Sequence, residues 1–200
     1  MTALWVIASS LLEPAKRLFQ KNRSPMPLTR GQWGMYLAHM GVGVFILGAT
    51  VTSSYNIETD SRAVPGDRWQ VDEYELYFRD IRRIEGVNYE ATEGEFEVWE
   101  GDQLVTILRP QKRVYRVQTS PMTEAAIDVG WGRDLFIALG DPLGDGAWSL
   151  RVQIKPLIRF IWLGALIMAF GGLLAIMDPR YRVKRTQEKD VISKQSLETA

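Results

Sequence analysis

Residues 33–55 read WGMYLAHMGVGVFILGATVTSSY and contain no Asp, Glu, Lys or Arg. Residues 157–177 read LIRFIWLGALIMAFGGLLAIM, and Arg159 is the single charged residue among them. An α-helix needs about 20 apolar residues to cross the hydrocarbon core of a bilayer. Both segments therefore predict transmembrane helices. The alternative, a pair of buried helices in a soluble core, is disfavoured because so few charges interrupt these runs.

Composition excludes several classes of function. The 200 residues carry 24 Lys and Arg against 24 Asp and Glu, so the formal net charge is zero. A protein that binds nucleic acid over its whole length would be basic, so we expect no nucleic-acid partner. The absence of Cys excludes disulfides, iron–sulfur clusters, Cys-ligated zinc and a thiol nucleophile. The single His excludes a metal site built from several His of this chain.

Charges around the two apolar segments predict the orientation in the membrane. Basic residues precede the first segment and follow the second, and such flanks mark the cytoplasmic side. They are Lys16, Arg17, Lys21, Arg23 and Arg30 before it, and Arg180, Arg182, Lys184 and Arg185 after it. Residues 54–155 carry a net charge of −7 and are expected on the opposite face. We therefore expect a multi-pass protein of a bacterial inner membrane, with 54–155 in the periplasm and the C-terminus in the cytoplasm.

Residues 54–155 have the pattern of a β domain. Short segments alternate apolar and polar residues, and turn-forming residues separate them. These segments are Tyr74–Ile84, Glu95–Trp99, Leu104–Leu108, Arg113–Gln118 and Trp148–Ile154. The turn at residues 100–102 predicts a hairpin, and the pattern as a whole favours a small antiparallel barrel or sandwich. The run GDPLGDG at 140–146 favours a plain turn over a calcium loop, because it lacks the EF-hand spacing.

The predicted fold class is an integral membrane α+β protein. It has two or three transmembrane helices and an antiparallel β-rich periplasmic domain between the last two spans. The apolar run at 2–12 ends at Glu13-Pro14, so it predicts either the end of a span or a short amphipathic anchor. The expected segments are an N-terminal partial span or anchor with a basic loop (1–32), a helix (33–53), the β domain (54–155), a second helix (156–178) and a cytoplasmic tail (179–200).

His39 is the most informative single residue. An ionisable side chain inside a membrane is costly to bury and therefore suggests function. Neutral imidazole is a good axial ligand for haem iron, and Met35, Val42, Gly43 and Ile46 share its helix face. The alternative is a histidine that hydrogen-bonds a neighbouring helix. A haem with two His ligands would need the second from a partner, since the chain has only one His.

Small residues form stripes on both apolar segments. Gly34, Ala38, Gly41 and Gly48 form one stripe, and Ala165 and Ala169 form a pair on the second segment. Such stripes let helices approach closely, so we expect these segments to pack against other helices. A lipid-facing stripe without consequence is the alternative.

Six longer strings, in order within residues 33–182, resemble the C-terminal region of the cytochrome c-type biogenesis protein CcmF family. They are GMYLAHMGVGVFILG (34–48), GVNYEA (86–91), RPQKRVYRVQTSPMTEAAI (109–127), GRDLFIALGDPL (132–143), DGAWSLRVQIKP (145–156) and WLGALIMAFGGLLAIMDPRYR (162–182). The resemblance implies a membrane component of cytochrome c maturation. Such proteins take haem from the haem chaperone CcmE. Together with apocytochrome-holding maturation subunits, they promote haem attachment to apocytochrome c.

The resemblance also implies roles for residues. The string LAH at 37–39 matches the motif whose His ligates a b-type haem, so His39 is the expected ligand of haem b iron. Residues of the family-like strings in 54–155 are expected to hold the β domain over the haem site or to contact a partner. They are Tyr89, Arg109, Lys112, Arg113, Tyr115, Thr123, Glu124, Arg133 and Asp134. For Arg113, Glu124 and Arg133, the alternative is an internal salt-bridge framework of the β domain.

Other family features are absent from these 200 residues. The sequence lacks the partner His of that haem, the tryptophan-rich WWD segment that presents the substrate haem, and the periplasmic histidines that flank it. The chain alone is therefore not expected to be an active lyase. It is either a fragment of a longer protein or the C-terminal subunit of a split version, whose partner supplies the N-terminal CcmF helices. The competing hypothesis is a membrane-anchored β domain that only scaffolds partner proteins and ligates no haem.

Overall fold

The computed structural model describes residues 2–19, 28–117 and 119–180. The chain divides into a helical unit, made of Met1–Thr50 and Arg159–Ala200, and a β unit, made of Val51–Ile158. Gln118, most of the tail expected at 179–200, and the basic residues Lys21 and Arg23 lie outside the described residues.

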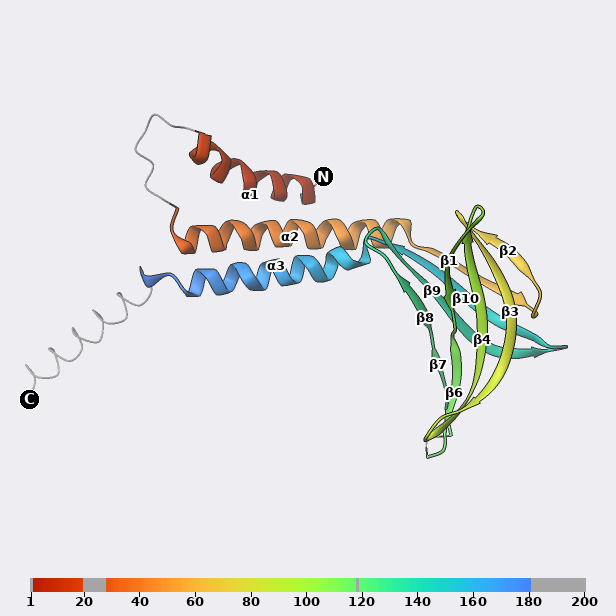
Figure 1. Ribbon diagram of the computed structural model, residues 1–200. Coiled ribbons are helices and arrows are strands. Elements are labelled where there is room, and N and C mark those ends of the chain that lie inside the picture. Colours follow the sequence, from red (N-terminus) through yellow and green to blue (C-terminus); the bar gives the residue numbers. More distant parts are fainter. Residues whose placement is uncertain (1, 20–27, 118, 181–200) are drawn as a thin grey trace, which may run out of the picture. The chain divides into compact units, whose positions relative to one another are not determined.

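The helical unit contains α1 (Thr2–Phe19), the main part of α2 (Arg30–Tyr55) and α3 (Ile158–Ile176). Helices α2 and α3 run side by side and antiparallel, as Figure 1 shows. Both are long and apolar enough to cross a membrane by length and composition. Helix α2 extends beyond the expected segment 33–53 at both ends, and α3 is shorter than the expected 156–178. Where a span would begin and end within them stays a prediction.

Glycines bring α2 and α3 into backbone contact. A Cβ built on Gly41 would lie 2.7 Å from the carbonyl oxygen of Gly164, and one built on Gly34 would lie 2.5 Å from that of Gly171. No side chain fits at such distances, so the close approach requires glycine at these positions. The predicted stripe on α2 thus does contact a helix. On α3, however, the contact is made by Gly164 and Gly171, seven residues apart, and Ala169 is exposed.

Helix α1 continues through Pro14 to Phe19, although the sequence suggested an interruption at Glu13-Pro14. Proline removes one backbone hydrogen bond and bends a helix, but it does not have to end it. Ala3 and Ile7 of α1 lie against Gly43 of α2. The helix is amphipathic, and the structure's candidate spans within the described residues are α2 and α3 alone.

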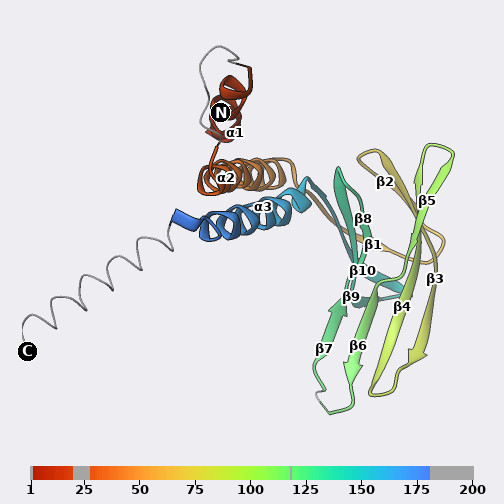
Figure 2. The ribbon, with the colours of Figure 1, turned by 60° about the vertical axis from the view of Figure 1, so that its left-hand side comes forward.

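The β unit is a sandwich of two antiparallel sheets, whose layers are visible in Figure 2. The first sheet has the order β1-β10-β9-β8 and the second β2-β3-β4-β6-β7, with β5 paired to β4. The strands are β1 (Ile57–Ala63), β2 (Arg68–Val71), β3 (Tyr74–Glu85), β4 (Tyr89–Glu100), β5 (Gln103–Leu108), β6 (Gln111–Tyr115), β7 (Pro121–Glu124), β8 (Ala126–Val129), β9 (Arg133–Gly144) and β10 (Ala147–Pro156). Of the two expected architectures, the sandwich is therefore the one observed.

The core of the sandwich comes from the inward residues of both sheets. Phe78 and Phe96 are fully buried and stack with their ring centroids 4.4 Å apart, in planes inclined by 13°. Leu135, Ile137 and Leu139 of β9 close the core from the other sheet and are also fully buried. Alternation along β9 places every second residue in this core.

Two hairpin turns follow the local sequence. The predicted turn after Glu100 is confirmed, since Glu100 pairs with Gln103 and Gly101 has φ +58°. The run 140–146 is a turn only at its end, because β9 continues through Gly144. Asp145 and Gly146 form the two-residue turn with φ +51° and +73°, values that favour an Asp-Gly pair. The remainder of that run is strand because β10 pairs along it.

The β unit is closed where the chain enters and leaves it. The Thr52 hydroxyl donates a hydrogen bond of 2.7 Å to the carbonyl oxygen of Pro156. Strand β1 then pairs with β10 over its whole length, from Ile57↔Ile154 to Ala63↔Trp148. The first and last strands of the unit are therefore neighbours.

Candidate functional site: the uncovered face of helix α2

Two of the three faces of α2 are covered by other helices of the chain. The glycine face, with Gly34 and Gly41, lies on α3. The second face lies toward α1, where Tyr36 and Met40 line an apolar hollow of about 260 Å³ together with residues of α1. The third face contains Met35, His39, Val42 and Ile46, which follow one another at intervals of three or four residues. Met35, His39 and Val42 are exposed. Gly43, which the sequence placed on the same face, is instead buried against Ala3 and Ile7 of α1. The uncovered face is therefore narrower than predicted, because α1 covers its edge at Gly43.

The imidazole of His39 is fixed by its own helix. Its Nδ1 lies 2.8 Å from the backbone carbonyl oxygen of Met35, one turn earlier. A carbonyl oxygen can only accept, so Nδ1 must carry the proton in this hydrogen bond. In the neutral ring the lone pair is then on Nε2, which has no hydrogen-bond partner within the described residues. This is the arrangement that orients a metal-ligating histidine.

The surroundings of His39 suit a single axial ligand better than a cage for a bare ion. The neighbours on its face are aliphatic or thioether side chains. Within residues 2–19, 28–117 and 119–180, no three His, Cys, Asp or Glu side chains gather to hold a metal ion. An apolar face with one nitrogen donor fits a flat, mostly apolar group whose iron needs one imidazole from this side.

Asp178 is a positioning residue that the sequence did not single out. It is 4% exposed, and its Oδ2 accepts a hydrogen bond of 2.7 Å from the backbone N–H of Gly31 in the first turn of α2. A carboxylate at a helix N-terminus satisfies an otherwise unpaired N–H and interacts favourably with the helix dipole. Asp178 follows α3 in sequence, so it fixes the register of α2 against α3. The signal was an Asp-Pro pair directly after an apolar helix.

Four of the predicted β-domain residues form one cluster. The Arg113 guanidinium lies over the ring of Tyr89, 4.6 Å from its centroid, and pairs with Glu124 at 3.5 Å. The Tyr115 ring packs edge-on against Tyr89, with centroids 5.7 Å apart. Strands β4, β6 and β7 carry these residues side by side. They contact one another, and Arg113 Nε also donates a hydrogen bond of 2.8 Å to Gln111 Oε1 of the same strand. This is the arrangement of an internal framework.

Arg133 and Asp134 lie elsewhere, at the start of β9. The Arg133 Nε donates a hydrogen bond of 2.9 Å to the Tyr74 hydroxyl, and its guanidinium also pairs with Asp128. Burial raises the pKa of Tyr74, against the opposing effect of the Arg133 hydrogen bond. Asp134 is 8% exposed, and its Oδ1 accepts a hydrogen bond from the backbone N–H of Gly130 at 3.2 Å. These two residues therefore join β9 to the second sheet and to the β8–β9 loop.

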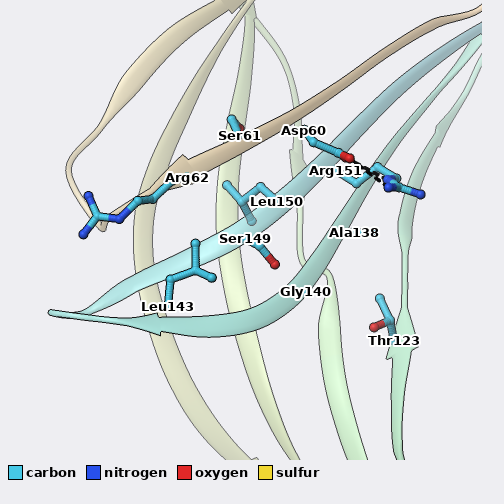
Figure 3. A pocket seen from close by; sticks show the side chains of 10 residues that line it. All are labelled: Asp60, Ser61, Arg62, Thr123, Ala138, Gly140, Leu143, Ser149, Leu150 and Arg151. Atoms are coloured by element: carbon cyan, nitrogen blue, oxygen red, sulfur yellow. Dashed lines mark hydrogen bonds and ion pairs between the residues drawn. The ribbon is translucent and has the colours of Figure 1, made fainter.

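A groove of about 540 Å³ lies over β1, β9 and β10, and its ten lining residues are labelled in Figure 3. Arg151 is held there by a bidentate pair with Asp60, at 2.7 and 2.8 Å. The Ser149 hydroxyl accepts a hydrogen bond from the backbone N–H of Asp141. The Ser61 hydroxyl, which also lines the groove, is buried without a hydrogen-bond partner among the described residues. The groove therefore combines paired polar groups with one unpaired hydroxyl.

Glu93 is a buried carboxylate on β4, with an exposed fraction of 6%. It accepts hydrogen bonds from Arg82 Nε at 2.9 Å and from Gln111 Nε2 at 2.6 Å. Burial raises the pKa of Glu93, but the hydrogen bonds from Arg82 and Gln111 outweigh it and hold the pKa below its usual range. A carboxyl with a lowered folded-state pKa stabilises the fold above its unfolded-state pKa. That contribution is lost as the pH falls through the folded-state value.

We therefore expect Glu93→Gln to destabilise the full chain at neutral pH and the deficit to shrink below about pH 4. Urea unfolding at a series of pH values measures this difference. Glu90→Gln is the matched control, because Glu90 is exposed on the same strand and its carboxylate has no hydrogen bond or ion pair within the described residues. A Glu93→Gln deficit that stays constant from pH 7 to pH 3 would contradict the assignment.

Comparison with known proteins identifies the family. The family model described as "CcmF C-terminal beta-sandwich" matches residues 54–156, just over half of the chain. The chain belongs to the CcmF family. It is 44% identical over 190 residues to the cytochrome c-type biogenesis protein CcmF of Pseudomonas fluorescens, covering 92% of this chain and 28% of that protein. It is 39% identical over 187 residues to CcmF of Escherichia coli strain K12, covering 94% of this chain and 28% of that protein.

A solved structure shares the fold. The structure titled "Cytochrome c Heme Lyase CcmF" superposes with a TM-score of 0.70 at 17% identity, covering 88% of this chain and 29% of that one. The expected resemblance to the CcmF family is thus confirmed. The chain spans about a quarter of the length of these CcmF relatives.

Proposed function

We propose that the chain is the C-terminal portion or subunit of a CcmF-like haem lyase, in which Nε2 of His39 ligates the iron of haem b. The observation that carries this proposal is the geometry of His39. Its Nδ1 is bound to the Met35 carbonyl and its Nε2 is unpaired on the one face of α2 that neither α1 nor α3 covers. Haem, when bound, supplies an iron that takes an imidazole ligand and exchanges one electron. The Met35 carbonyl holds the imidazole in one tautomer, and the neighbouring Met35, Val42 and Ile46 side chains give it apolar surroundings.

The proposal includes placement in a bacterial inner membrane. Helices α2 and α3 have the length and hydropathy of spans, and basic flanks favour a cytoplasmic location for the C-terminus. The same flanks favour the periplasm for the sandwich, because residues 54–155 lie between the two helices and thus on the opposite side from the basic flanks. The expected segment limits at 32, 53, 155 and 178 belong to this proposal.

The proposed partners follow from what this chain does not contain. A second imidazole ligand and further helices against the His39 face would come from the N-terminal CcmF helices, in the same protein or in a split subunit. The other proposed partners are membrane lipid, the haem chaperone CcmE, the apocytochrome-holding subunits and apocytochrome c. Because the 200 residues contain neither the WWD segment nor periplasmic histidines, lyase activity requires those partners.

Within the sandwich, Arg113, Glu124 and Arg133 are proposed to be framework residues. Their charged groups pair with one another or with Asp128 and Tyr74. Tyr89 lies under the Arg113 guanidinium, and Asp134 accepts a hydrogen bond from the backbone N–H of Gly130. The framework holds the outer surface of the sandwich in shape for a partner.

The test is the absorption spectrum of the chain co-purified in detergent with the N-terminal CcmF helices. Wild type is expected to show the Soret and α bands of a low-spin b-type haem, and His39→Ala is expected to lose them. Met35→Leu is the matched control, because it changes a neighbour on the same face but keeps the carbonyl that binds Nδ1. Added imidazole should restore the bands in His39→Gly.

The competing function is a membrane-anchored sandwich that only holds partner proteins together. It predicts that His39→Ala leaves the spectrum and the yield of cytochrome c unchanged, while charge reversal at Arg113 or Glu124 breaks the assembly. A stable complex of both halves without haem in wild type would contradict the haem-ligand proposal and support this one.

A further inference from the structure

The loop Gly130–Trp131–Gly132 between β8 and β9, here called the Trp131 loop, presents an unusual side chain. Trp131 is 79% exposed, and it ends an apolar row on the outer side of β8. The row begins with Ile127 (45% exposed) and continues with Val129 (49% exposed). Ile127 and Val129 are alternate residues of β8, so their side chains point to the same side of the strand. Trp131 follows two residues later in the loop and adds a third exposed apolar side chain at the end of the strand. An exposed apolar row of this kind marks an interaction surface.

The Trp131 loop is held rigidly. The backbone N–H of Gly130 donates to the carbonyl oxygen of Arg133 at 3.0 Å and to Oδ1 of Asp134 at 3.2 Å. The carbonyl oxygen of Gly132 accepts a hydrogen bond of 2.9 Å from the backbone N–H of Leu157. Hydrogen bonds therefore fix the backbone on both sides of Trp131. Ordering this loop for an interaction costs little further conformational entropy.

The hydrogen bond to Leu157 fixes which part of the chain the loop lies beside. Leu157 is the residue directly before α3, which begins at Ile158. If α3 crosses the bilayer from Ile158, then Leu157 and the loop bonded to it lie at the level of the lipid headgroups. Tyr55, which ends α2 in the same unit, is also exposed at 70%. Trp and Tyr are enriched at this level of membrane proteins, because their rings are apolar and their N–H or O–H groups are polar.

The opposite end of the sandwich provides the contrast. Arg133 binds Tyr74 at the start of β3, so the Trp131 loop lies at that end of the strand. Val87 follows the other end of β3 and is 98% exposed. A strand of 12 residues spans roughly 40 Å at about 3.3 Å per residue. Figures 1 and 2 both show the β3–β4 hairpin and the β8–β9 loop at opposite ends of the sandwich.

We propose that the Trp131 loop is a membrane-interface anchor, in which the indole of Trp131 and the apolar edge of β8 enter the headgroup layer of the bilayer. The occupant of this surface is lipid, because the loop is bonded to the residue at which α3 would enter the membrane. The chain already attaches the sandwich to the membrane at two points, where it joins α2 and α3. The anchor adds a third point, which would stop the sandwich from rotating about the other two. This inference rests on the proposal that α3 crosses the bilayer.

The chain contains no Cys, so a single introduced Cys can be labelled with a fluorophore at one known position. We would label Trp131→Cys, Val87→Cys and, in α3, Leu166→Cys, in the full chain with its N-terminal partner in lipid vesicles. Lipids with a nitroxide near the headgroup are expected to quench the label at 131 most strongly. Lipids with a nitroxide deep in the acyl chain should quench the label at 166, and a water-soluble quencher should quench the label at 87.

Quenching at 131 by the water-soluble reagent alone, or by no reagent, would overturn the anchor; the second result would mean that protein covers the loop. A label at 166 that the water-soluble reagent quenches would show that the span proposal itself is wrong. A further variant keeps the indole in place. With the label at Val129→Cys, headgroup quenching is expected with Trp131 present and should be lost or reduced in Trp131→Ser. Equal quenching in the two backgrounds would contradict a role for the indole.

Discussion

Gly171→Leu is expected to separate α2 from α3 and to destabilise the helical unit by about 3 kcal/mol or more. A Cβ at Gly171 would lie 2.5 Å from the backbone nitrogen of Ala38 and 2.7 Å from the carbonyl oxygen of Gly34. Backbone atoms of a helix cannot move aside as a flexible side chain can. The two helices must therefore move apart over their whole contact. The measurement is the temperature at which the full chain loses its monodisperse elution in detergent.

Gly172→Leu is the matched control for this prediction. Gly172 is the next residue of α3, and a Cβ there would meet no atom within 4 Å. The same change of size and helix propensity is therefore made on the side that faces away from α2. We expect it to shift stability by no more than about 0.5 kcal/mol. Equal loss of stability in the two variants would mean that helix propensity, and not the glycine contact, decides the effect.

Phe78→Ala is expected to destabilise the sandwich by about 3–5 kcal/mol. The Phe78 side chain is fully buried and stacked on Phe96, so its removal leaves a cavity between the two sheets. Phe96 also meets the edge of Trp69 at 6.4 Å, which means the loss affects a connected aromatic group. The urea midpoint of the strand signal in circular dichroism should fall by roughly 2 M.

Tyr77→Ala serves as the control for Phe78→Ala. Tyr77 is the preceding residue of β3, faces the other side of the sheet and has the Arg68 guanidinium 4.4 Å from its ring centroid. Its truncation removes a partly exposed ring and a contact worth about 0.5–1 kcal/mol. A midpoint shift as large as that of Phe78→Ala would contradict the placement of Phe78 in the core.

The apolar helices could be predicted from the sequence because hydropathy over 20 residues is a strong local signal. The strands that alternate clearly, such as 95–99, could be predicted for the same reason. Strand β9 was missed because LFIAL at 135–139 is apolar on both faces, which removes the alternation. Strands β1, β7 and β8 are short or polar, and they exist because they pair with a neighbour distant in sequence.

Of the candidate site, the sequence could predict only that a histidine lies in an apolar helix. His39 stood out because it is an ionisable group within an apolar run. The hydrogen bond to Met35 depends on the side-chain rotamer, and the uncovered face depends on where α1 and α3 pack. Gly164 and Gly171 contact the stripe on α2, which lies more than 100 residues away in the sequence. No local pattern could therefore predict that these glycines, and not Ala165 and Ala169, make the helix contact.

The pairing of β1 with β10 and the hydrogen bond from Thr52 to Pro156 hold the two ends of the sandwich domain next to each other. The sandwich is thus an insertion between α2 and α3 whose ends are fixed by its own fold. Bringing together the ends of a flexible loop of this length would cost about 4 kcal/mol of entropy. Here the folding of the sandwich offsets that cost, because the pairing of its first and last strands already brings the two ends together. The residues between β1 and β10 can therefore change in sequence, or gain insertions at the hairpins far from the helices. Such changes would not alter the distance between the points where the chain enters and leaves the sandwich.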